Sequence, residues 1–113
     1  MRALEFYSGL GGLHYSLLEA RRDAGDVEVL AAFDINDLAN RVYEHNHGLR
    51  PNPADIRSLT PSFLADFRAD TWLLSPPCQP YTRQGLQRGS EDPRAESFIL
   101  LLDKLALMAH KPT

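Results

Sequence analysis

The stretch RALEFYSGLGGLHYSLLEARRD, residues 2–23, contains the pattern that decides the fold. Its first five residues, RALEF (2–6), are predicted to form a buried strand, and the glycine-rich turn YSGLGG (7–12) follows directly. A helix is predicted to continue to about Asp23, because apolar residues then recur at helical spacing: Leu13, Leu17, Leu18 and Ala20. The segment AGD (24–26) interrupts this helix. The stretch is therefore a strand, a glycine turn and a helix.

The same alternation continues beyond residue 26. VEVLAAF (27–33) is predicted to be a second strand, which ends at Asp34. A second helix, which fades by Gly48, carries four apolar residues on one face: Leu38, Ala39, Val42 and Tyr43. ADI (54–56) is a candidate for a short third strand.

The last part of the chain adds two helices and a further strand. TPSFLADF (60–67) is predicted to begin a helix, with Thr60 as its N-cap and Pro61 in its first turn. TWLLS (71–75) is a compact apolar strand, and a helical stripe extends over 95–109: Phe98, Leu101, Leu102, Leu105 and Met108. Strands that alternate with helices predict an α/β fold with a parallel sheet, whose ligands bind at the C-terminal ends of the strands. The residues predicted at those ends are Gly9, Gly11, Gly12, Asp34, Asp55 and Cys78.

Length and composition limit the class of protein. The chain has 113 residues, of which 43% are hydrophobic and 24% charged, so one folded domain at most is expected. The net charge of −3 argues against a broad basic face for nucleic acid, although a local one is compatible with Arg83, Arg88 and Arg94. With a single cysteine, no secretory signal and no apolar run of about 20 residues, we expect an intracellular protein without an internal disulfide.

Gly9, Gly11 and Gly12 allow two interpretations. They could let the backbone approach a ligand before the helix begins, or they could simply form a tight turn that packs the helix on the strand. The dinucleotide fingerprint G-x-G-x-x-G is not met, because position 14 is His14. The turn therefore points away from a nicotinamide cofactor.

Asp34 also has two candidate roles. An acidic residue at the end of the second strand accepts hydrogen bonds from ribose hydroxyls in nucleoside-binding folds. The alternative is an N-cap for a helix that starts at Ile35 or Asn36. Asp55 and Ile56 are weaker candidates, since ADI alone is more typical of a strand end.

Cys78 lies in the loop SPPCQPYTRQG (75–85), between prolines. A lone cysteine is often a small buried hydrophobe, but a proline-bounded loop after a strand is a poor core element and a suitable holder for a nucleophile. A metal site fits badly, because His45 and His47 lack zinc-like spacing and there is no second cysteine. These two histidines, with His14 and His110, are predicted to be surface or capping residues.

Taken together, three segments resemble the cytosine-5 methyltransferase family: LEFYSGLGGLHYSL (4–17), AAFDINDLANRVYEHN (31–46) and SPPCQPYTRQG (75–85). Within the family they are most similar to the eukaryotic branch that methylates a cytosine in the anticodon loop of aspartate tRNA. The resemblance implies a Rossmann-like fold that binds S-adenosylmethionine, with helices on both faces of a parallel sheet that is incomplete at its C-terminus. It also implies a nucleic-acid substrate, with tRNA favoured over DNA, no metal, and a location in the cytoplasm and/or nucleus.

The resemblance also assigns roles to individual residues. Cys78 would be the nucleophile that adds to C6 of cytosine, so that C5 can accept a methyl group. Asp34 would bind the donor's ribose, Ile35 would pack on adenine, Asp55 and Ile56 would hold the adenine edge and face, and Pro77 would lie near the sulfonium. Gln79 and Arg83 would contact the substrate. The donor's methionine portion would be wrapped by residues 6–12: Phe6, Tyr7, Ser8, Gly9, Leu10, Gly11 and Gly12.

Later motifs of the family do not occur in these residues: Glu-Asn-Val, an Arg-x-Arg strand, the target-recognition region and the C-terminal helix. We therefore expect residues 1–113 to be the N-terminal part of a catalytic domain, with the donor-binding half and the nucleophile loop. A C-terminal half or a second chain would supply the rest. Three hypotheses follow: part of a tRNA cytosine-5 methyltransferase, part of a DNA cytosine-5 methyltransferase, or a non-catalytic fragment that at most binds the donor.

Overall fold

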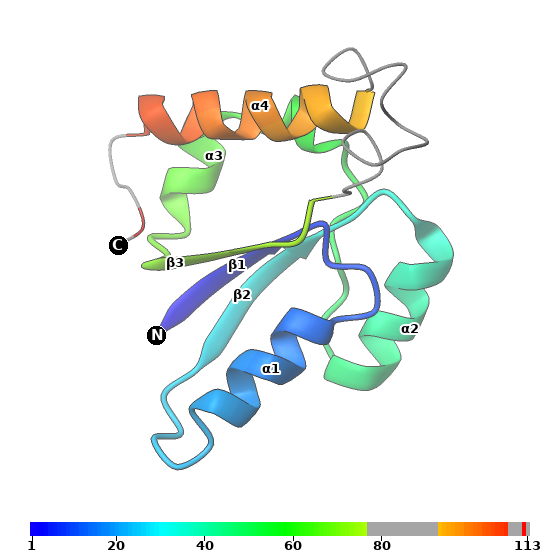
Figure 1. The fold of residues 1–113 in the computed structure, drawn as a ribbon, viewed down its shortest axis with the longest axis vertical. Coiled ribbons are helices and arrows are strands. Elements are labelled where there is room, and N and C mark those ends of the chain that lie inside the picture. The colour runs from blue at the N-terminus through cyan, green and yellow to red at the C-terminus, as the bar shows by residue number, and fades with distance from the viewer. Residues whose placement is uncertain (77–92, 109–111, 113) are drawn as a thin grey trace.

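The computed structural model describes residues 1–76, 93–108 and 112 as alternating strands and helices (Figure 1). The elements are, in order, β1 (Arg2–Phe6), α1 (Gly12–Ala20), β2 (Glu28–Phe33), α2 (Asp37–His47), the 3-10 helix η1 (Ile56–Ser58), α3 (Pro61–Asp66), β3 (Thr71–Leu74) and α4 (Pro93–Leu107). This order confirms the predicted α/β alternation.

The three described strands form a parallel sheet in the order β2-β1-β3, with β1 in the centre. Phe6 pairs with Phe33 on one side and with Leu74 on the other. The three strands therefore end level with one another. The loops that follow them leave from a single edge of the sheet, as the sequence predicts.

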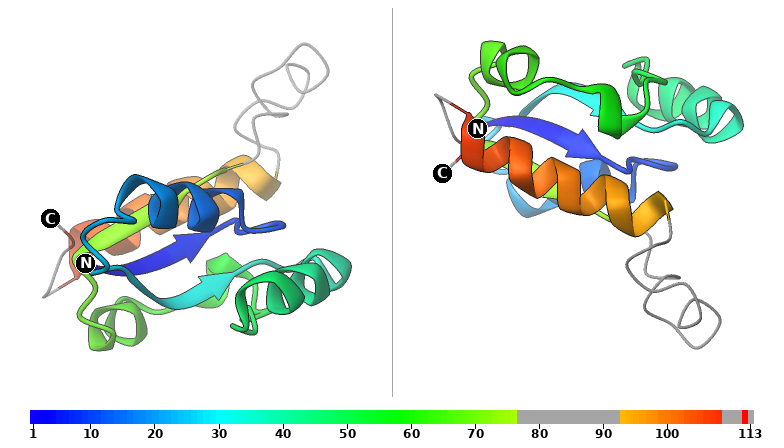
Figure 2. Two further views of the ribbon diagram at one scale, coloured as in Figure 1. Left: turned by 90° about the horizontal axis from the view of Figure 1, so that it is seen from below. Right: turned by 90° about the horizontal axis from the view of Figure 1, so that it is seen from above.

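Helices cover both faces of this sheet (Figures 1 and 2). Alternate residues of β1 point to opposite faces, as in any strand. Leu4 and Phe6 are fully buried in the core on the α3 and α4 side, whereas Glu5 points to the side of α1 and α2 and bonds to Tyr43. One face is therefore apolar and the other carries a buried charge.

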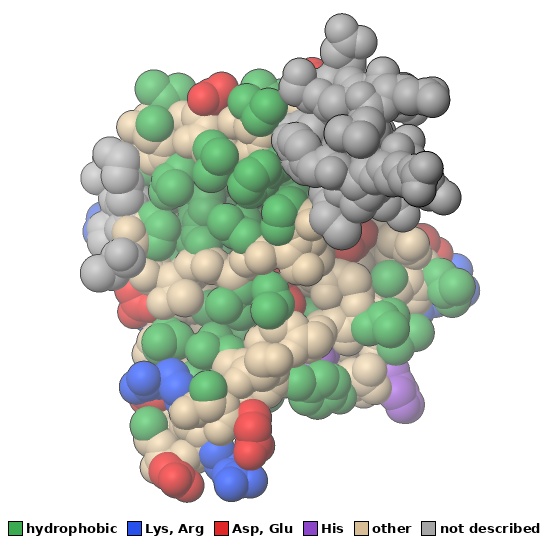
Figure 3. All heavy atoms as spheres, viewed as in Figure 1, with side chains coloured by type: hydrophobic (Ala, Val, Ile, Leu, Met, Phe, Trp, Pro, Cys, Tyr) green, Lys and Arg blue, Asp and Glu red, His purple; other side chains and the backbone are tan. Residues whose placement is uncertain are grey.

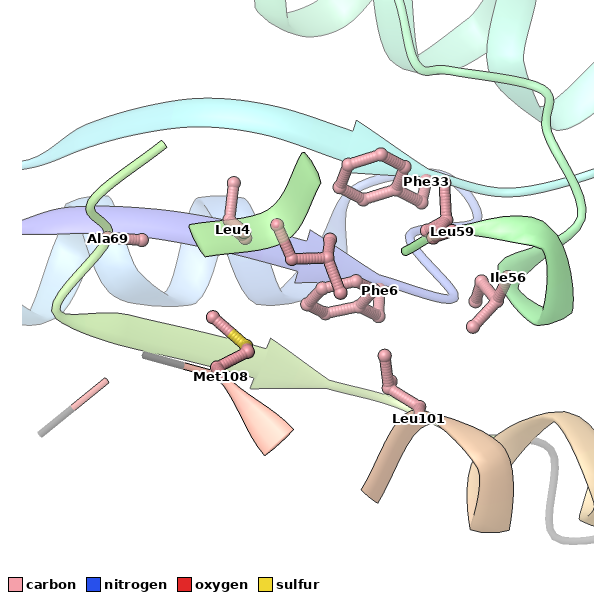
Figure 4. Close-up of a cluster of buried hydrophobic side chains, with 9 residues drawn as sticks. Leu4, Phe6, Phe33, Ile56, Leu59, Ala69, Leu101 and Met108 are labelled. Carbon is pink, nitrogen blue, oxygen red and sulfur yellow. The ribbon is translucent and has the colours of Figure 1, made fainter. Parts of the chain in front are cut away.

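The apolar core gathers β1 and β2 with the elements after residue 55 (Figure 4). The Phe6 ring stacks on Phe33 at a centroid distance of 5.1 Å and contacts the tilted Trp72 ring at 4.7 Å. The buried members of this core are Leu4, Phe6, Phe33, Ile56, Leu59, Leu64, Ala69, Leu101 and Met108. These contacts fix α4 across the sheet.

Most predicted elements are confirmed, with small differences at their ends. The Thr60 hydroxyl caps α3 by accepting from the Phe63 amide at 3.1 Å, and Pro61 opens that helix. The first helix ends at Ala20, before Asp23, and α4 begins at Pro93 instead of residue 95.

The prediction of a third strand at ADI (54–56) is wrong. The Asp55 carboxylate accepts from the Arg57 amide at 2.9 Å, and this local bond turns the chain into η1 instead of a strand. The pairing that does extend β2 comes from Asn52, which forms an isolated parallel bridge with Phe33.

The predicted apolar face of the second helix is only partly the face that packs. Tyr43 is buried and Ala39 is partly buried, as predicted, but Leu38 is 71% and Val42 37% exposed, and Asn40 is buried in their place. Similarly, Leu102 of the α4 stripe is exposed while Leu101 is buried. Figure 3 shows hydrophobic side chains gathered around α4 and β3, where β3 forms one edge of the described sheet.

Among the helices of the described residues, none is long and apolar enough to span a bilayer.

Candidate functional site

The candidate site lies at the edge where β1 and β2 end. The Ser8 amide donates to the carbonyl of Phe33 at 3.2 Å, which joins the glycine turn to the end of β2. The Asp34 amide donates to the Asn52 carbonyl at 3.2 Å, which brings in the segment before Asp55. Three of the four segments that the sequence predicts at this edge therefore meet there, and the fourth, with Cys78, lies outside the described residues.

The glycine turn uses left-handed backbone at several positions. Gly9 has a φ of 53° and Gly11 a φ of 92°, a region that favours glycine. A Cβ on Gly11 would lie 2.2 Å from Nε2 of His47, whereas a Cβ on Gly9 would meet nothing within 4 Å. Each interpretation of the glycines therefore applies to a different position. Gly11 fits the tight turn, because it packs α1 against α2, and Gly9 fits the approach of a ligand, because it faces open space.

Tyr7 is a non-glycine residue with a left-handed φ of 56°, which costs about 1 kcal/mol or more. Its hydroxyl is 2.8 Å from the hydroxyl of Ser97, in the first turns of α4. This bond links the turn after β1 to the start of α4. It ties together two segments 90 residues apart in the sequence.

Asp34 holds the glycine turn in place. Its Oδ2 accepts from the Gly9 amide at 2.9 Å and its Oδ1 accepts from the Asn36 amide at 2.8 Å. The N-cap of α2 is Asn36, whose Oδ1 accepts from the Ala39 amide at 3.0 Å. The capping interpretation of Asp34 is therefore wrong, because Asn36 occupies the cap position and Asp34 bridges two loops.

Two buried polar atoms near this edge lack a partner among the described residues. They are Oγ of Ser8 and Oδ1 of Asn40, whose residues are 5% and 7% exposed. Leaving such a group unpaired costs about 1–3 kcal/mol, which a bound polar ligand would recover. By contrast, Leu10 and Ile35 are 58% and 68% exposed and offer apolar surface at the same edge. The edge suits a ligand with both polar and apolar parts.

Asp55 is already engaged by its own neighbour. Its carboxylate accepts from the Arg57 amide and guanidinium, with Oδ2 and Nη2 2.7 Å apart, and the hydrogen bonds from Arg57 lower the pKa of Asp55. The Ile56 side chain is 4% exposed and belongs to the core. Of this pair, only Asp55 has a side chain outside the core.

Segment 55–57 is fastened to α4. The Lys104 ammonium donates to the carbonyls of Ile56 at 2.9 Å and Arg57 at 2.6 Å, and burial lowers the pKa of Lys104. An ion pair of 3.7 Å joins Arg57 to Glu96. The start of α4 therefore has fixed contacts with the candidate site.

Sequence reasoning missed a buried polar layer below the glycine turn. Glu5 is 1% exposed, Tyr43 is fully buried and His14 is 8% exposed. The prediction that His14 is a surface or capping residue is wrong, because its Nδ1 lies 2.7 Å from the Tyr43 hydroxyl in the interior. The signal that could have revealed this layer is Glu5 itself, a charged residue inside the apolar strand RALEF.

Several predicted site residues lie outside the described residues: Pro77, Cys78, Gln79 and Arg83. His110, predicted to be at the surface, also lies outside them. The part of the chain that the structure describes contains no group of three or more histidine, cysteine or acidic side chains that could hold a metal ion.

Comparison with known proteins places these features in context. The family model described as C-5 cytosine-specific DNA methylase matches residues 1–111. A DNA (cytosine-5)-methyltransferase of Dictyostelium discoideum is 44% identical over 113 residues, all of this chain and 29% of the relative. A tRNA (cytosine(38)-C(5))-methyltransferase of Schizosaccharomyces pombe is 39% identical over 112 residues, 99% of this chain and 33% of the relative.

Solved structures agree with these matches. The crystal structure of the S. pombe Dnmt2 methyltransferase superposes with a TM-score of 0.78 at 35% identity, over 99% of this chain and 31% of that one. A Spodoptera frugiperda DNMT2 mutant gives a TM-score of 0.76 at 40% identity, over 97% and 33%. The chain thus spans about a third of the length of the relatives it matches.

Proposed function

This chain belongs to the C-5 cytosine-specific DNA methylase family, and we propose that it forms the donor-binding, N-terminal part of an enzyme that methylates C5 of cytosine in tRNA. The family match over residues 1–111 is the observation that carries the proposal. The site geometry supports it, because the glycine turn and Asp34 meet at the ligand-binding edge of the sheet, with 2.9 Å between the Gly9 amide and Asp34 Oδ2.

The residues at this edge suit S-adenosylmethionine. The Ser8 hydroxyl lacks a partner among the described residues and could accept or donate a hydrogen bond to the polar end of the methionine portion. The open space beside Gly9 lets the backbone approach that portion closely, and Phe6, Tyr7, Leu10, Gly11 and Gly12 complete the turn.

The nucleoside end of the donor would lie toward β2. Asp34 would accept from the ribose hydroxyls, and the exposed Ile35 side chain would pack on adenine. Asp55 would accept from the adenine amino group while it stays paired with Arg57, and Ile56 would support that position from the core. Pro77, next to the cysteine, would lie near the sulfonium.

The chemistry proposed for the cysteine loop rests on the family match and on the resemblance of SPPCQPYTRQG (75–85) to the family. The Cys78 thiolate adds to C6 of the cytosine ring, which makes C5 nucleophilic. S-adenosylmethionine, when bound, supplies an electrophilic methyl group for C5. Loss of the C5 proton and elimination of the Cys78 thiolate from C6 then restore the aromatic ring and free the enzyme. Gln79 and Arg83, on the same loop, would contact the base and the substrate phosphates.

Two observations bear on the substrate. Several relatives of similar identity are tRNA (cytosine(38)-C(5))-methyltransferases, among them the proteins of S. pombe and Mus musculus. The Dictyostelium relative carries the name of a DNA methyltransferase, so duplex DNA is the second candidate substrate. The net charge of −3 over this chain favours the smaller footprint of a tRNA loop.

The test is a methyl-transfer assay on the full-length protein that contains this chain, with radiolabelled donor and with tRNA and duplex DNA side by side. We expect label in tRNA, and loss of transfer in Cys78→Ala with donor binding retained. Preference for the duplex would promote the DNA hypothesis. Transfer within tenfold of wild type in Cys78→Ala would remove Cys78 as the nucleophile. Donor binding without transfer to either substrate would favour a non-catalytic protein.

A further inference from the structure

Three buried side chains form a hydrogen-bonded series on the α1 and α2 side of the sheet. The Tyr43 hydroxyl of α2 is 2.6 Å from Oε1 of Glu5 on β1 and 2.7 Å from Nδ1 of His14 on α1. Each residue comes from a different element, and each is at most 8% exposed. We call this set the Glu5–Tyr43–His14 series. None of the three is among the residues assigned to donor or substrate.

The chemistry of the groups gives the series a direction. A tyrosine hydroxyl has a single proton, and an ionised Glu5 can only accept, so Tyr43 donates to Glu5. The same hydroxyl then accepts from His14, which requires a proton on Nδ1 of His14. Burial lowers the pKa of His14 to about 4, and burial beside Glu5 raises the pKa of Tyr43, so both stay uncharged near pH 7.

Glu5 also lies close to the start of α1. The N-cap of this helix is Gly11, which has no side chain to accept from the first amides. Burial raises the pKa of the Glu5 carboxyl, while hydrogen bonds from the Tyr43 hydroxyl and from the His14 backbone, in the first turn of α1, act to lower it. Glu5 therefore meets the first turn of α1 from the strand before the glycine turn.

The series reaches the glycine turn a second time through His47. The His14 ring stacks on His47 with 3.9 Å between centroids and 6° between planes. His47 in turn lies against Gly11, which has no room for a Cβ. The turn is thus held at its strand end by Glu5 and at its helix end by His14 and His47, on the side of the sheet away from the apolar core.

We propose that the Glu5–Tyr43–His14 series is a positioning device, which holds the glycine turn 7–12 in the conformation that binds the methyl donor. This inference rests on the proposed function for the identity of the ligand. The three residues would act through the turn and would not touch the reacting atoms. The competing explanation is that the series only stabilises the fold.

The decisive variant is Tyr43→Phe in the full-length protein, because it deletes the one oxygen that joins both hydrogen bonds. Tyr15→Phe is the matched control: Tyr15 is a half-exposed residue on α1, its ring also contacts His47, and its hydroxyl makes no hydrogen bond in the described residues. Leu64→Ala is the stability control, since Leu64 is buried in the core among residues on the other face.

Titration calorimetry with S-adenosylhomocysteine, well below every unfolding midpoint, gives the donor-site Kd of folded protein. We expect Tyr43→Phe to weaken binding about 5- to 20-fold, the loss of one or two buried hydrogen bonds. Both controls should stay within twofold, although Leu64→Ala lowers the melting temperature. In turnover assays the donor KM should rise in Tyr43→Phe while kcat at saturating donor stays within twofold.

Amide hydrogen exchange in the donor-free protein measures directly how well the glycine turn is held in place. Peptides covering residues 8–15 should exchange faster in Tyr43→Phe and unchanged in Leu64→Ala. An unchanged Kd together with unchanged exchange in Tyr43→Phe would overturn the positioning role. If wild-type protein bound no S-adenosylhomocysteine, the proposed donor site would be refuted. The exchange result would still decide whether the Glu5–Tyr43–His14 series positions the turn.

Discussion

Asp34→Ala is expected to weaken both the fold and donor binding, by amounts that the structure allows us to separate. The substitution removes the acceptor of two backbone amides, those of Gly9 at 2.9 Å and Asn36 at 2.8 Å. The Gly9 bond is partly buried, and a hydrogen bond to a charged group of this kind contributes about 1.5–3 kcal/mol. The Asn36 amide is exposed and can form a hydrogen bond with water instead. We therefore expect the free energy of unfolding to fall by about 1–3 kcal/mol.

Donor binding should fall by a further, independent amount. Ribose hydroxyls that lose their acceptor in a closed site cost about 1–3 kcal/mol, a factor of about 5 to 150 in Kd. Titration calorimetry on the full-length protein measures the change in donor Kd. Chemical denaturation measures the change in the free energy of unfolding.

Asn36→Ala is the matched control, because it removes the true cap of α2, costs about 1 kcal/mol of stability and leaves Asp34 in place. Its donor Kd should not change. A donor Kd for Asp34→Ala within twofold of wild type would refute the ribose role and leave Asp34 as a tether alone. An equal loss of affinity in Asn36→Ala would show that loosening of the loop, and not a lost ribose contact, explains the effect.

Three further predictions concern the turn, the buried histidine and the segment itself. Gly11→Ala should destabilise the protein in thermal unfolding, because its φ is 92° and the new Cβ would meet His47, whereas Gly12→Ala has open space and should be neutral or slightly stabilising; equal midpoints for the two variants would contradict this. His14 has a pKa of about 4 when folded and an ordinary pKa of 6.5 when the chain is unfolded, so between these values the unfolded chain binds more protons and stability falls as the pH falls. In denaturation at several pH values, wild type should lose up to about 1.4 kcal/mol per pH unit relative to His14→Gln over that range, and parallel curves would contradict the assignment. Residues 1–113 expressed alone should be inactive and poorly soluble, because β3 is an open edge of the described sheet beside exposed apolar side chains of α4; a monodisperse, cooperatively unfolding monomer by size exclusion and calorimetry would show this to be wrong.

Local patterns in the sequence were sufficient for the order of elements, apart from the strand wrongly predicted at ADI (54–56), and for the meeting of the glycine turn with Asp34. Alternating strands and helices imply parallel strands, and parallel strands bring their C-terminal ends to one edge. The glycine turn and Asp34 could therefore be placed together before any contact was known. The Thr60 cap was also predictable, because an N-cap side chain and the amide it accepts from are only three residues apart.

The buried network could not be predicted in this way. Glu5 and Tyr43 are 38 residues apart and His14 and Tyr43 are 29 apart, and they meet only because α1 and α2 pack on the same side of β1. Amphipathic spacing was only partly right for α2, since Leu38 and Val42 are exposed, and Tyr43, which it did place on the buried face, is buried in a polar contact. Helical periodicity shows which residues share a face but not which neighbour that face will meet.

The sequence by itself determined a parallel α/β chain with a glycine turn, an acidic strand end and a proline-bounded cysteine, because strand periodicity, turn chemistry and proline constraints act over a few residues. Only the tertiary structure decided that Asp34 tethers Gly9 instead of capping α2, that His47 packs against Gly11 and leaves no room for a Cβ, and that Glu5 accepts from Tyr43 in the interior. The physical reason is that a buried polar group must find a partner wherever packing supplies one, and packing is settled by the whole fold.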